Sequence, residues 1–300
     1  MSEEILHEGS GINFKFRPAA FAAISLLIVF FLYQLVGGGL TVYLFGIIPS
    51  ADQTTAVRLA TMGAEIMFIL VPAYFLSRIQ TMEWRRLLSI RKTDWYFVFL
   101  AIVGVISLEQ LLELYLYVQG LIPLPSPLKH ILDQFQQIIE QTYKTLLTAK
   151  TPFDFLLVVL VVAVTPAICE ETLFRGLTQG NFRLSMSNRK AIILTGIIFG
   201  FYHLDPFTFV ALCVLGIYLS YLLAASESII VPMVAHFTNN FISTLVLYAM
   251  NRDSYIAPSG GPPLSVGYII GWSAVLALIF GVTVILTEQH KHNMQEVNQR

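Results

Sequence analysis

The segment FDFLLVVLVVAVTPAICEETLFRGLTQ, residues 153–179, decides how this chain folds. A helix of roughly 20 apolar residues crosses the hydrocarbon core of a bilayer, so this segment is long enough to be a membrane span. Its second half nevertheless carries Glu170, Glu171 and Arg175. An ionisable side chain in mid-span costs about 2.5–3.5 kcal/mol on insertion scales. Three of them therefore indicate a role beyond packing.

The composition of the whole chain agrees with a membrane fold. Of its 300 residues, 56% are hydrophobic and 12% are charged, whereas soluble domains carry roughly a quarter charged residues. A water-soluble fold could not cover so much apolar surface. The net charge of −1 argues against a nucleic-acid partner. Cys169 and Cys213 both lie in apolar runs, which predicts no disulfide framework.

The distribution of apolar runs predicts an all-α, polytopic membrane bundle of about eight transmembrane helices plus one amphipathic surface helix. The expected spans are Pro18–Ile48, Ala56–Leu76, Asp94–Val118, Phe153–Gln179, Ala191–His203, Pro206–Ala224, Ile229–Tyr248 and Leu264–Leu286. The fifth span is short and almost adjoins the sixth. These two could instead form one broken helical hairpin, which would change the count by one.

Residues 129–150 differ from the spans because apolar residues recur there at helical spacing with Gln, Asp, Glu and Lys between them. This pattern predicts an amphipathic helix on the membrane surface. A helix that packs on the bundle would have the same pattern, and both alternatives stay open.

The basic residues of the loops predict the orientation. With the N-terminus inside, the inner segments hold 12 Lys and Arg residues and the outer segments hold 5, which satisfies the positive-inside rule. We therefore expect an integral multi-pass protein of the cell membrane with both termini cytoplasmic. The expected organisation is a cytoplasmic segment at 1–17, membrane helices and the amphipathic helix at 18–150, a catalytic core at 151–250, and a last transmembrane helix with a cytoplasmic tail at 251–300.

The charged residues within 165–176 are expected to have different roles. Glu171 and Arg175 are four apart on one helical face and can form an ion pair. Glu170 lies about 100° around the helix and is the less neutralised carboxylate, as a general base requires. Pro166 removes a helical hydrogen bond and predicts a bend just before the pair.

Two other expected spans carry polar groups of matching character. FGFYH, residues 199–203, places His203 four residues after Phe199, and HFTNN, residues 236–240, places Asn240 four residues after His236. Histidine can exchange a proton, and an amide can donate hydrogen bonds to a developing oxyanion. Each feature alone is more often structural. Helical rise places all of them near the middle or inner half of the membrane, so a bundle core could bring them together.

These three stretches resemble the signature motifs of the CPBP family, which includes CAAX prenyl proteases, bacteriocin-processing enzymes and proteins like lysostaphin resistance protein A. The family pattern is EExxxR, FxxxH and HxxxN. All three occur here in family order on separate expected spans, between residues 170 and 240. No motif position departs from the pattern. Residues 1–150 resemble the family only in being hydrophobic.

The resemblance implies an intramembrane endopeptidase in which Glu170 activates water and His203 assists. It implies that His236 and Asn240 stabilise the oxyanion, and that Glu171 and Arg175 orient the site. The substrate would be a membrane-associated peptide or protein, lipidated or not. The hydrolase would act by direct attack of water, without an acyl-enzyme.

Several alternatives remain at this point. We expect no cofactor, although Glu170, His203 and His236 have the composition of a catalytic zinc site. The same polar residues could line the path of a proton-coupled transporter, or belong to a catalytically silent membrane scaffold or immunity protein. Among other polar residues, Glu65, Glu109 and Glu113 are expected to have no catalytic role, and Asp205 is expected to cap the next helix.

Overall fold

The structure is a computed structural model that describes residues 13–123, 125–249 and 264–299. These residues are predominantly helical and contain no strand. Seven helical segments in them are long and apolar enough to cross a membrane: Pro18–Phe45, Thr54–Gln80, Trp95–Gly120, Pro152–Arg183, Phe209–Ser226, Ile230–Ala249 and Val266–Val297. The all-α, polytopic membrane fold is thus confirmed, and the protein is an integral membrane protein. Parts of the expected segments 1–17 and 251–300 lie outside the described residues.

Three of these segments are composite helices that contain π-helical turns. The first consists of α2 (Pro18–Phe30), η1 (Phe31–Gly37) and α3 (Gly38–Phe45). The second consists of α4 (Thr54–Glu65), η3 (Ile66–Leu70) and α5 (Val71–Gln80), preceded by the short η2 (Ala51–Gln53). The third consists of α9 (Pro152–Val158), η4 (Val159–Val164), α10 (Thr165–Glu171), η5 (Thr172–Gln179) and α11 (Gly180–Arg183). Because π-helical turns concentrate at functional sites, the two that flank α10 draw attention to its glutamates.

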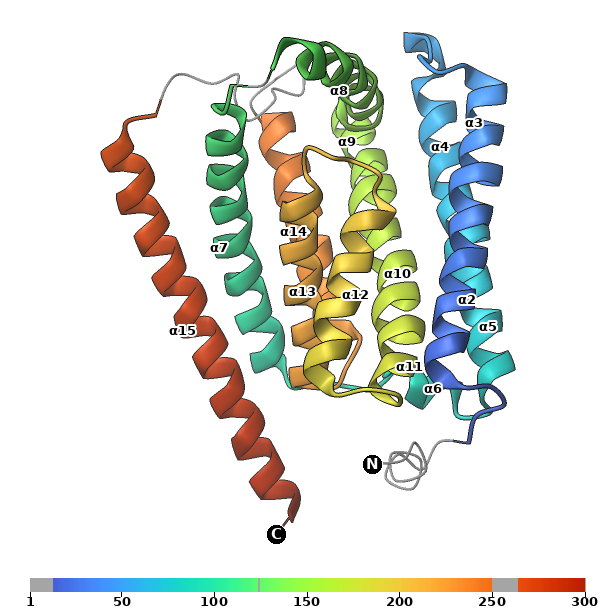
Figure 1. Cartoon of the computed structure of the whole chain (residues 1–300), viewed down its shortest axis with the longest axis vertical. Coiled ribbons are helices and arrows are strands. Elements are labelled where there is room, and N and C mark those ends of the chain that lie inside the picture. The colour runs from blue at the N-terminus through green and yellow to red at the C-terminus, as the bar shows by residue number, and fades with distance from the viewer. Residues whose placement is uncertain (1–12, 124, 250–263, 300) are drawn as a thin grey trace.

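The remaining helices complete the bundle. They are α6 (Trp84–Leu87), α7 (Trp95–Gly120), α8 (Ser126–Leu147), α12 (Asn188–Tyr202), α13 (Phe209–Ser226), α14 (Ile230–Ala249) and α15 (Val266–Gln299). Figure 1 shows α10 between the α2–α5 helices on one side and α12, α13 and α14 on the other. α15 packs along α7 at the far edge. The helix with the paired glutamates is therefore central.

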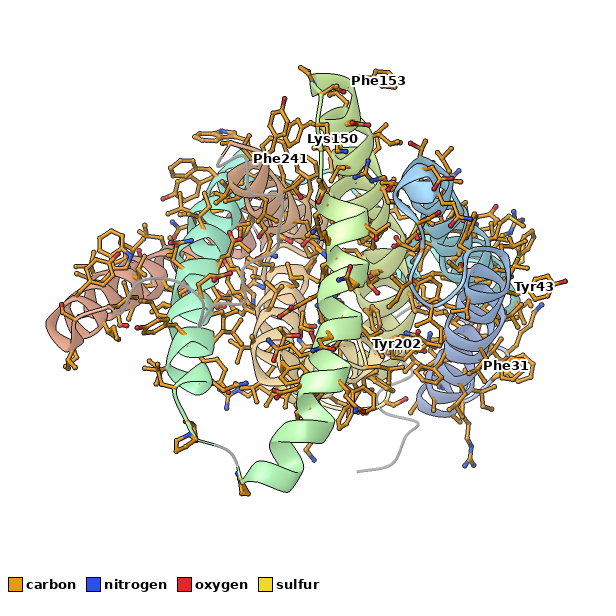
Figure 2. All side chains as sticks on the ribbon, turned by 90° about the horizontal axis from the view of Figure 1, so that it is seen from above. Phe31, Tyr43, Lys150, Phe153, Tyr202 and Phe241 are labelled. Atoms are coloured by element: carbon orange, nitrogen blue, oxygen red, sulfur yellow. The ribbon has the colours of Figure 1, made fainter. Side chains whose placement is uncertain are left out.

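Large apolar side chains on the outer surface fit a lipid environment. Phe31, Tyr43 and Phe153 point away from the bundle in Figure 2 and are exposed to 56%, 85% and 80%. In water such a surface would promote association, whereas in a bilayer it contacts the acyl chains. Lipid takes the place of solvent around this fold.

The expected span Ala191–His203 differs most from the structure. It corresponds to α12, which has 15 residues and is not among the seven spanning segments. The helix ends because Leu204 adopts the left-handed conformation, with φ of 50°, and because Asp205 precedes Pro206, which disfavours helical geometry. His203 therefore follows the helix end instead of lying inside a span.

The amphipathic stretch forms α8, which crosses the top end of the bundle transverse to the spanning helices (Figures 1 and 2). Its C-terminal end is tied to α4, because the buried Arg58 donates a hydrogen bond to the Leu146 carbonyl at 3.0 Å and another to the Thr148 carbonyl. The two alternatives drawn from the sequence are thus compatible. α8 lies at a surface and is also anchored to the bundle.

Three glycines let α12 and α13 approach closely. A Cβ added at Gly196 would lie 2.4 Å from the Ile217 nitrogen, and one at Gly216 would lie 2.7 Å from the Gly196 carbonyl oxygen. A Cβ at Gly200 would lie 2.5 Å from Cys213 Sγ. No larger residue fits without moving a helix. This contact fixes the position of α12 and hence of His203 at its end.

Candidate active site

Glu171 and Arg175 form a buried ion pair in the central helix. Arg175 Nη1 donates to Glu171 Oε1 at 2.8 Å, and both side chains are 0% exposed. Arg175 Nη2 also donates to the Gly216 carbonyl at 2.9 Å. The pairing expected from the i,i+4 spacing is present. Since a buried charge is stable only when paired and hydrogen-bonded, this pair is a fixed part of the core.

His236 joins this pair from α14. Its Nδ1 lies 2.8 Å from Glu171 Oε1, and the carboxylate can only accept, so Nδ1–H is the donor. His236 is 3% exposed. Glu171 therefore orients both Arg175 and His236, and Nε2 of the histidine is left for another partner. We call Glu171, Arg175 and His236 the buried cluster.

Phe199 connects the three stretches. Its ring lies 4.5 Å below the Arg175 guanidinium, 5.9 Å from the His236 ring and 4.7 Å from the His203 ring. A guanidinium over an aromatic face is a favourable cation–π arrangement. Phe199 belongs to the FGFYH motif, but the sequence predicted no role for it. Its spacing four residues before His203 was the signal that the two rings lie close together.

His203 and its surroundings fix a particular tautomer. His203 Nδ1 lies 2.8 Å from the Phe199 carbonyl, which can only accept, so Nδ1–H is the donor. Nε2 of the neutral ring then carries a lone pair. Within the described residues Asp205 forms no hydrogen bond with this ring; its carboxylate accepts from the Phe207 nitrogen and from the Thr208 hydroxyl. Asp205 is thus the expected cap for the turn that leads into α13.

Asn240 donates a hydrogen bond to a backbone carbonyl that Pro166 cannot bond. In an α-helix the N–H of residue 166 bonds to the carbonyl of residue 162, but proline has no N–H. The Val162 carbonyl accepts from Asn240 Nδ2 at 2.9 Å, and Asn240 Oδ1 accepts from Asn239 Nδ2 at 3.1 Å. Both contacts fix the amide plane. One N–H of Asn240 remains available to a ligand.

Glu170 differs from Glu171 in burial and in pairing. It is half-buried and forms no ion pair within the described part of the chain, although the Oε2 atoms of both glutamates lack a hydrogen-bond partner there. His203 and Asn240 are also half-buried. For their shared partial burial we call Glu170, His203 and Asn240 the half-buried cluster. Its members come from α10, from the end of α12 and from α14, and each has hydrogen-bonding capacity that the described residues do not use.

Glu65 is a neighbour of Glu170 for which the sequence predicted no catalytic role. It ends α4, is 6% exposed, and lies close enough to Glu170 and Tyr33 to interact with both electrostatically. Its Oε2 also has no partner within the described ranges. The signal for it was available, because a carboxylate in mid-span is costly there as well. The sequence did not show which helix face Glu65 occupies, because the π-helical turn η3 that follows Glu65 was not predicted.

The remaining glutamates of the spans lie elsewhere. Glu109 accepts a hydrogen bond from Ser243 on α14 at 2.5 Å, and Glu113, one turn further along α7, is exposed. Among residues 13–123, 125–249 and 264–299, no three His, Cys, Asp or Glu side chains form a group that could hold a metal ion. Glu170, His203 and His236 do not form such a group in this structure.

Comparison with protein families identifies the central part of the chain. Residues 152–242 match the family described as type II CAAX prenyl endopeptidase Rce1-like. This stretch is similar to a CAAX-protease core. This core runs from α9 to the middle of α14 and holds Glu170, Glu171, Arg175, His203, His236 and Asn240. It supports the CPBP resemblance and a CAAX-type intramembrane protease in general terms. Searches of curated proteins and of solved structures found no match.

Proposed function

We propose that this protein is an intramembrane endopeptidase that hydrolyses a peptide bond of a membrane-associated peptide or protein by glutamate-activated water. The observation that carries the proposal is the contrast between adjacent carboxylates within the CAAX-protease core. Glu171 is fully buried and is paired through Oε1 with Arg175 and His236, whereas Glu170 is half-buried and has no cationic partner in an ion pair within the described residues. A base must reach water and be able to accept a proton, and of the two Glu170 is the more accessible and the less neutralised carboxylate.

The proposed reaction begins with water between Glu170 and His203. The Glu170 carboxylate takes a proton as the water oxygen bonds to the scissile carbonyl carbon, and the lone pair on His203 Nε2 orients the water. The carbonyl π electrons move to oxygen and create an oxyanion. Protonated Glu170 then gives its proton to the amide nitrogen as the carbon–nitrogen bond breaks. The products are a carboxyl group and an amine, and Glu170 is regenerated.

The oxyanion would be stabilised from α14. Asn240 has one amide N–H not used by Val162, and a protonated His236 would present Nε2–H while Nδ1–H stays on Glu171. Two such donors aimed at a developing charge form an oxyanion hole. Arg175 would hold the Glu171 carboxylate in place. The buried cluster thus sets the geometry, and the half-buried cluster meets the substrate.

The surroundings suggest where the substrate enters and how the protein is oriented. We infer that the end of the bundle with α6 and the C-terminal end of α15 is cytoplasmic, because this end carries the basic residues of the α6 region and of the α11–α12 turn (Figure 1). The end of α12 would then lie toward the outer leaflet. A substrate anchored in the membrane, with or without a lipid modification, would reach Glu170 from there.

The test is cleavage by the purified protein in liposomes that contain a library of membrane-anchored peptides, including prenylated ones. Glu170→Gln keeps the shape but removes the base, so we expect the rate of new-terminus formation to fall about 10²–10⁴-fold. Glu113→Gln on α7 makes the same change outside the core and should leave the rate unchanged. Equal cleavage by Glu170→Gln and the unmodified protein would exclude the glutamate mechanism, and no cleavage by the unmodified protein would exclude these substrates.

A further inference from the structure

Four arginines line a cavity at the end of the bundle opposite α8. It has a volume of about 650 Å³, and its charged lining residues are Arg85, Arg86, Arg91, Arg183 and Glu227. They come from α6 and the turn after it, from α11, and from the turn between α13 and α14. Residues far apart in the chain therefore converge here. None of them belongs to the buried or the half-buried cluster.

The walls of this cavity are held firmly. A Cβ at Gly180 would lie 2.6 Å from the Leu87 carbonyl oxygen, so α6 packs directly on α11. The Ile229 nitrogen donates to the Ser89 carbonyl at 3.1 Å, and Ser228 Oγ donates to the Arg91 carbonyl at 2.6 Å. α6 is thus packed on α11, and the segment after it is hydrogen-bonded to the turn between α13 and α14, so these contacts fix the walls of the cavity.

Backbone strain is concentrated in the same place. Three non-glycine residues have positive φ within the described residues, and two of them, Ser89 at 53° and Glu227 at 54°, line the cavity. Glu227 follows the C-terminal end of α13, where glycine is the common residue. Left-handed geometry at a residue with a side chain is retained where the surroundings require it, often at binding sites. Here the side chain of Glu227 pairs with Arg91.

The cavity has more positive charge than its own residues neutralise. Apart from Arg86, which interacts electrostatically with Glu83, three arginines and one glutamate line the cavity, an excess of two positive charges. The Glu227 carbonyl and carboxylate both accept from Arg91, while Arg183 Nε donates to the uncharged Asn188 Oδ1 at 3.1 Å. Arg85 lies over the Trp84 ring at 5.1 Å, also without a negative partner in that contact. Guanidinium groups present paired donors that suit phosphate oxygens.

We propose that this cavity binds the phosphate group of an anionic lipid headgroup, with Arg85, Arg91 and Arg183 as the phosphate ligands. The cavity is the size of a small-molecule site, and it lies at the ends of membrane-spanning helices, where headgroups are found. Trp84 and Trp95, which border the segment that forms one wall, are residues typical of this interface. The site is independent of the proposed protease function.

The experiment uses the full chain in detergent, with native mass spectrometry and thermal unfolding as readouts. The probes are phosphatidylglycerol, phosphatidylcholine and inorganic phosphate. Arg85→Gln with Arg183→Gln removes two ligands and should weaken phosphatidylglycerol binding at least about tenfold, since each charge-assisted contact contributes on this scale. Arg189→Gln with Lys190→Gln removes the same charge from the nearby start of α12, outside the cavity lining, and should change binding less than about twofold.

A gain of affinity separates binding from misfolding. Glu227→Gln keeps the side-chain length but removes the one negative charge of the cavity, so it should bind phosphatidylglycerol several-fold more tightly. Phosphatidylglycerol binding with these responses supports the lipid source, and the same responses with inorganic phosphate alone assign the site to a soluble phosphate. Equal binding of phosphatidylcholine, an equal loss in the Arg189–Lys190 variant, or weaker binding by Glu227→Gln would overturn the site.

Discussion

The buried cluster and the half-buried cluster differ in exposure and in hydrogen bonding. Glu171, Arg175 and His236 have little or no exposure and are joined by hydrogen bonds of 2.8 Å. Glu170, His203 and Asn240 are half-buried, and each retains an unused donor or acceptor. The comparison teaches that adjacent glutamates in one motif can have separate tasks. Glu171 stabilises an arrangement of side chains, and Glu170 is the residue that we propose as the base.

The largest effect should come from breaking the buried cluster. Arg175→Met leaves the carboxylate of Glu171 buried without its cation, which destabilises a protein by about 3–5 kcal/mol. We expect a clear drop in Tm in detergent and loss of peptide cleavage. Thermal unfolding monitored by circular dichroism measures the first effect, and the liposome assay measures the second.

A paired variant sharpens this result. Adding Glu171→Gln to Arg175→Met removes the orphaned charge, so part of the lost stability should return while cleavage stays low because His236 has lost its carboxylate partner. If the double variant is less stable than Arg175→Met alone, the ion pair is not what holds the buried cluster together.

A smaller effect should follow from weakening the half-buried cluster. Asn240→Ala removes one oxyanion donor, and loss of such a donor lowers a rate constant by about 10²–10³-fold. The Tm should change much less than in Arg175→Met, because Asn240 is not an ion-pair partner. Initial cleavage rates at several peptide concentrations separate the effect on kcat from that on KM.

Two variants on α14 test this assignment. Asn240→Asp keeps the size but cannot donate to Val162 or to an oxyanion when ionised, so it should be as slow as Asn240→Ala. Ser243→Ala alters a hydrogen bond on the same helix outside both clusters and should leave the rate near normal. A fast Asn240→Asp enzyme would remove Asn240 from the oxyanion hole.

The smallest effect should come from the helix contact that supports His203. Gly196→Ala places a methyl group 2.4 Å from the Ile217 nitrogen, and overpacking of this kind costs about 1–3 kcal/mol. We expect a lower Tm and a modest fall in cleavage as His203 shifts. Gly281→Ala on α15 meets nothing within 4 Å and should be neutral or slightly stabilising. An unchanged Gly196→Ala protein would show that α12 tolerates displacement.

Local sequence predicted a large part of the fold because span formation depends on length and hydropathy. The expected span Asp94–Val118 is close to α7, Trp95–Gly120, and the i,i+4 pairing of Glu171 with Arg175 is present. Both follow from helical geometry within one segment. The end of α12 was harder to predict from the sequence, because nothing in the composition indicates that Leu204 adopts the left-handed conformation.

The sequence by itself determined that this chain is a membrane protein with few polar residues in the middle of its spans. It also determined that Glu171 and Arg175 form an ion pair. Tertiary structure alone decided that His236, 65 residues away, binds the same Glu171 carboxylate as Arg175. It also decided that Asn240 donates a hydrogen bond to the Val162 carbonyl, four residues before Pro166. Finally, it placed Glu65 close enough to Glu170 for the two to interact electrostatically. The reason is physical. Contacts within a helix are set by a fixed rise and turn, whereas contacts between helices depend on how side chains and glycines let whole helices pack.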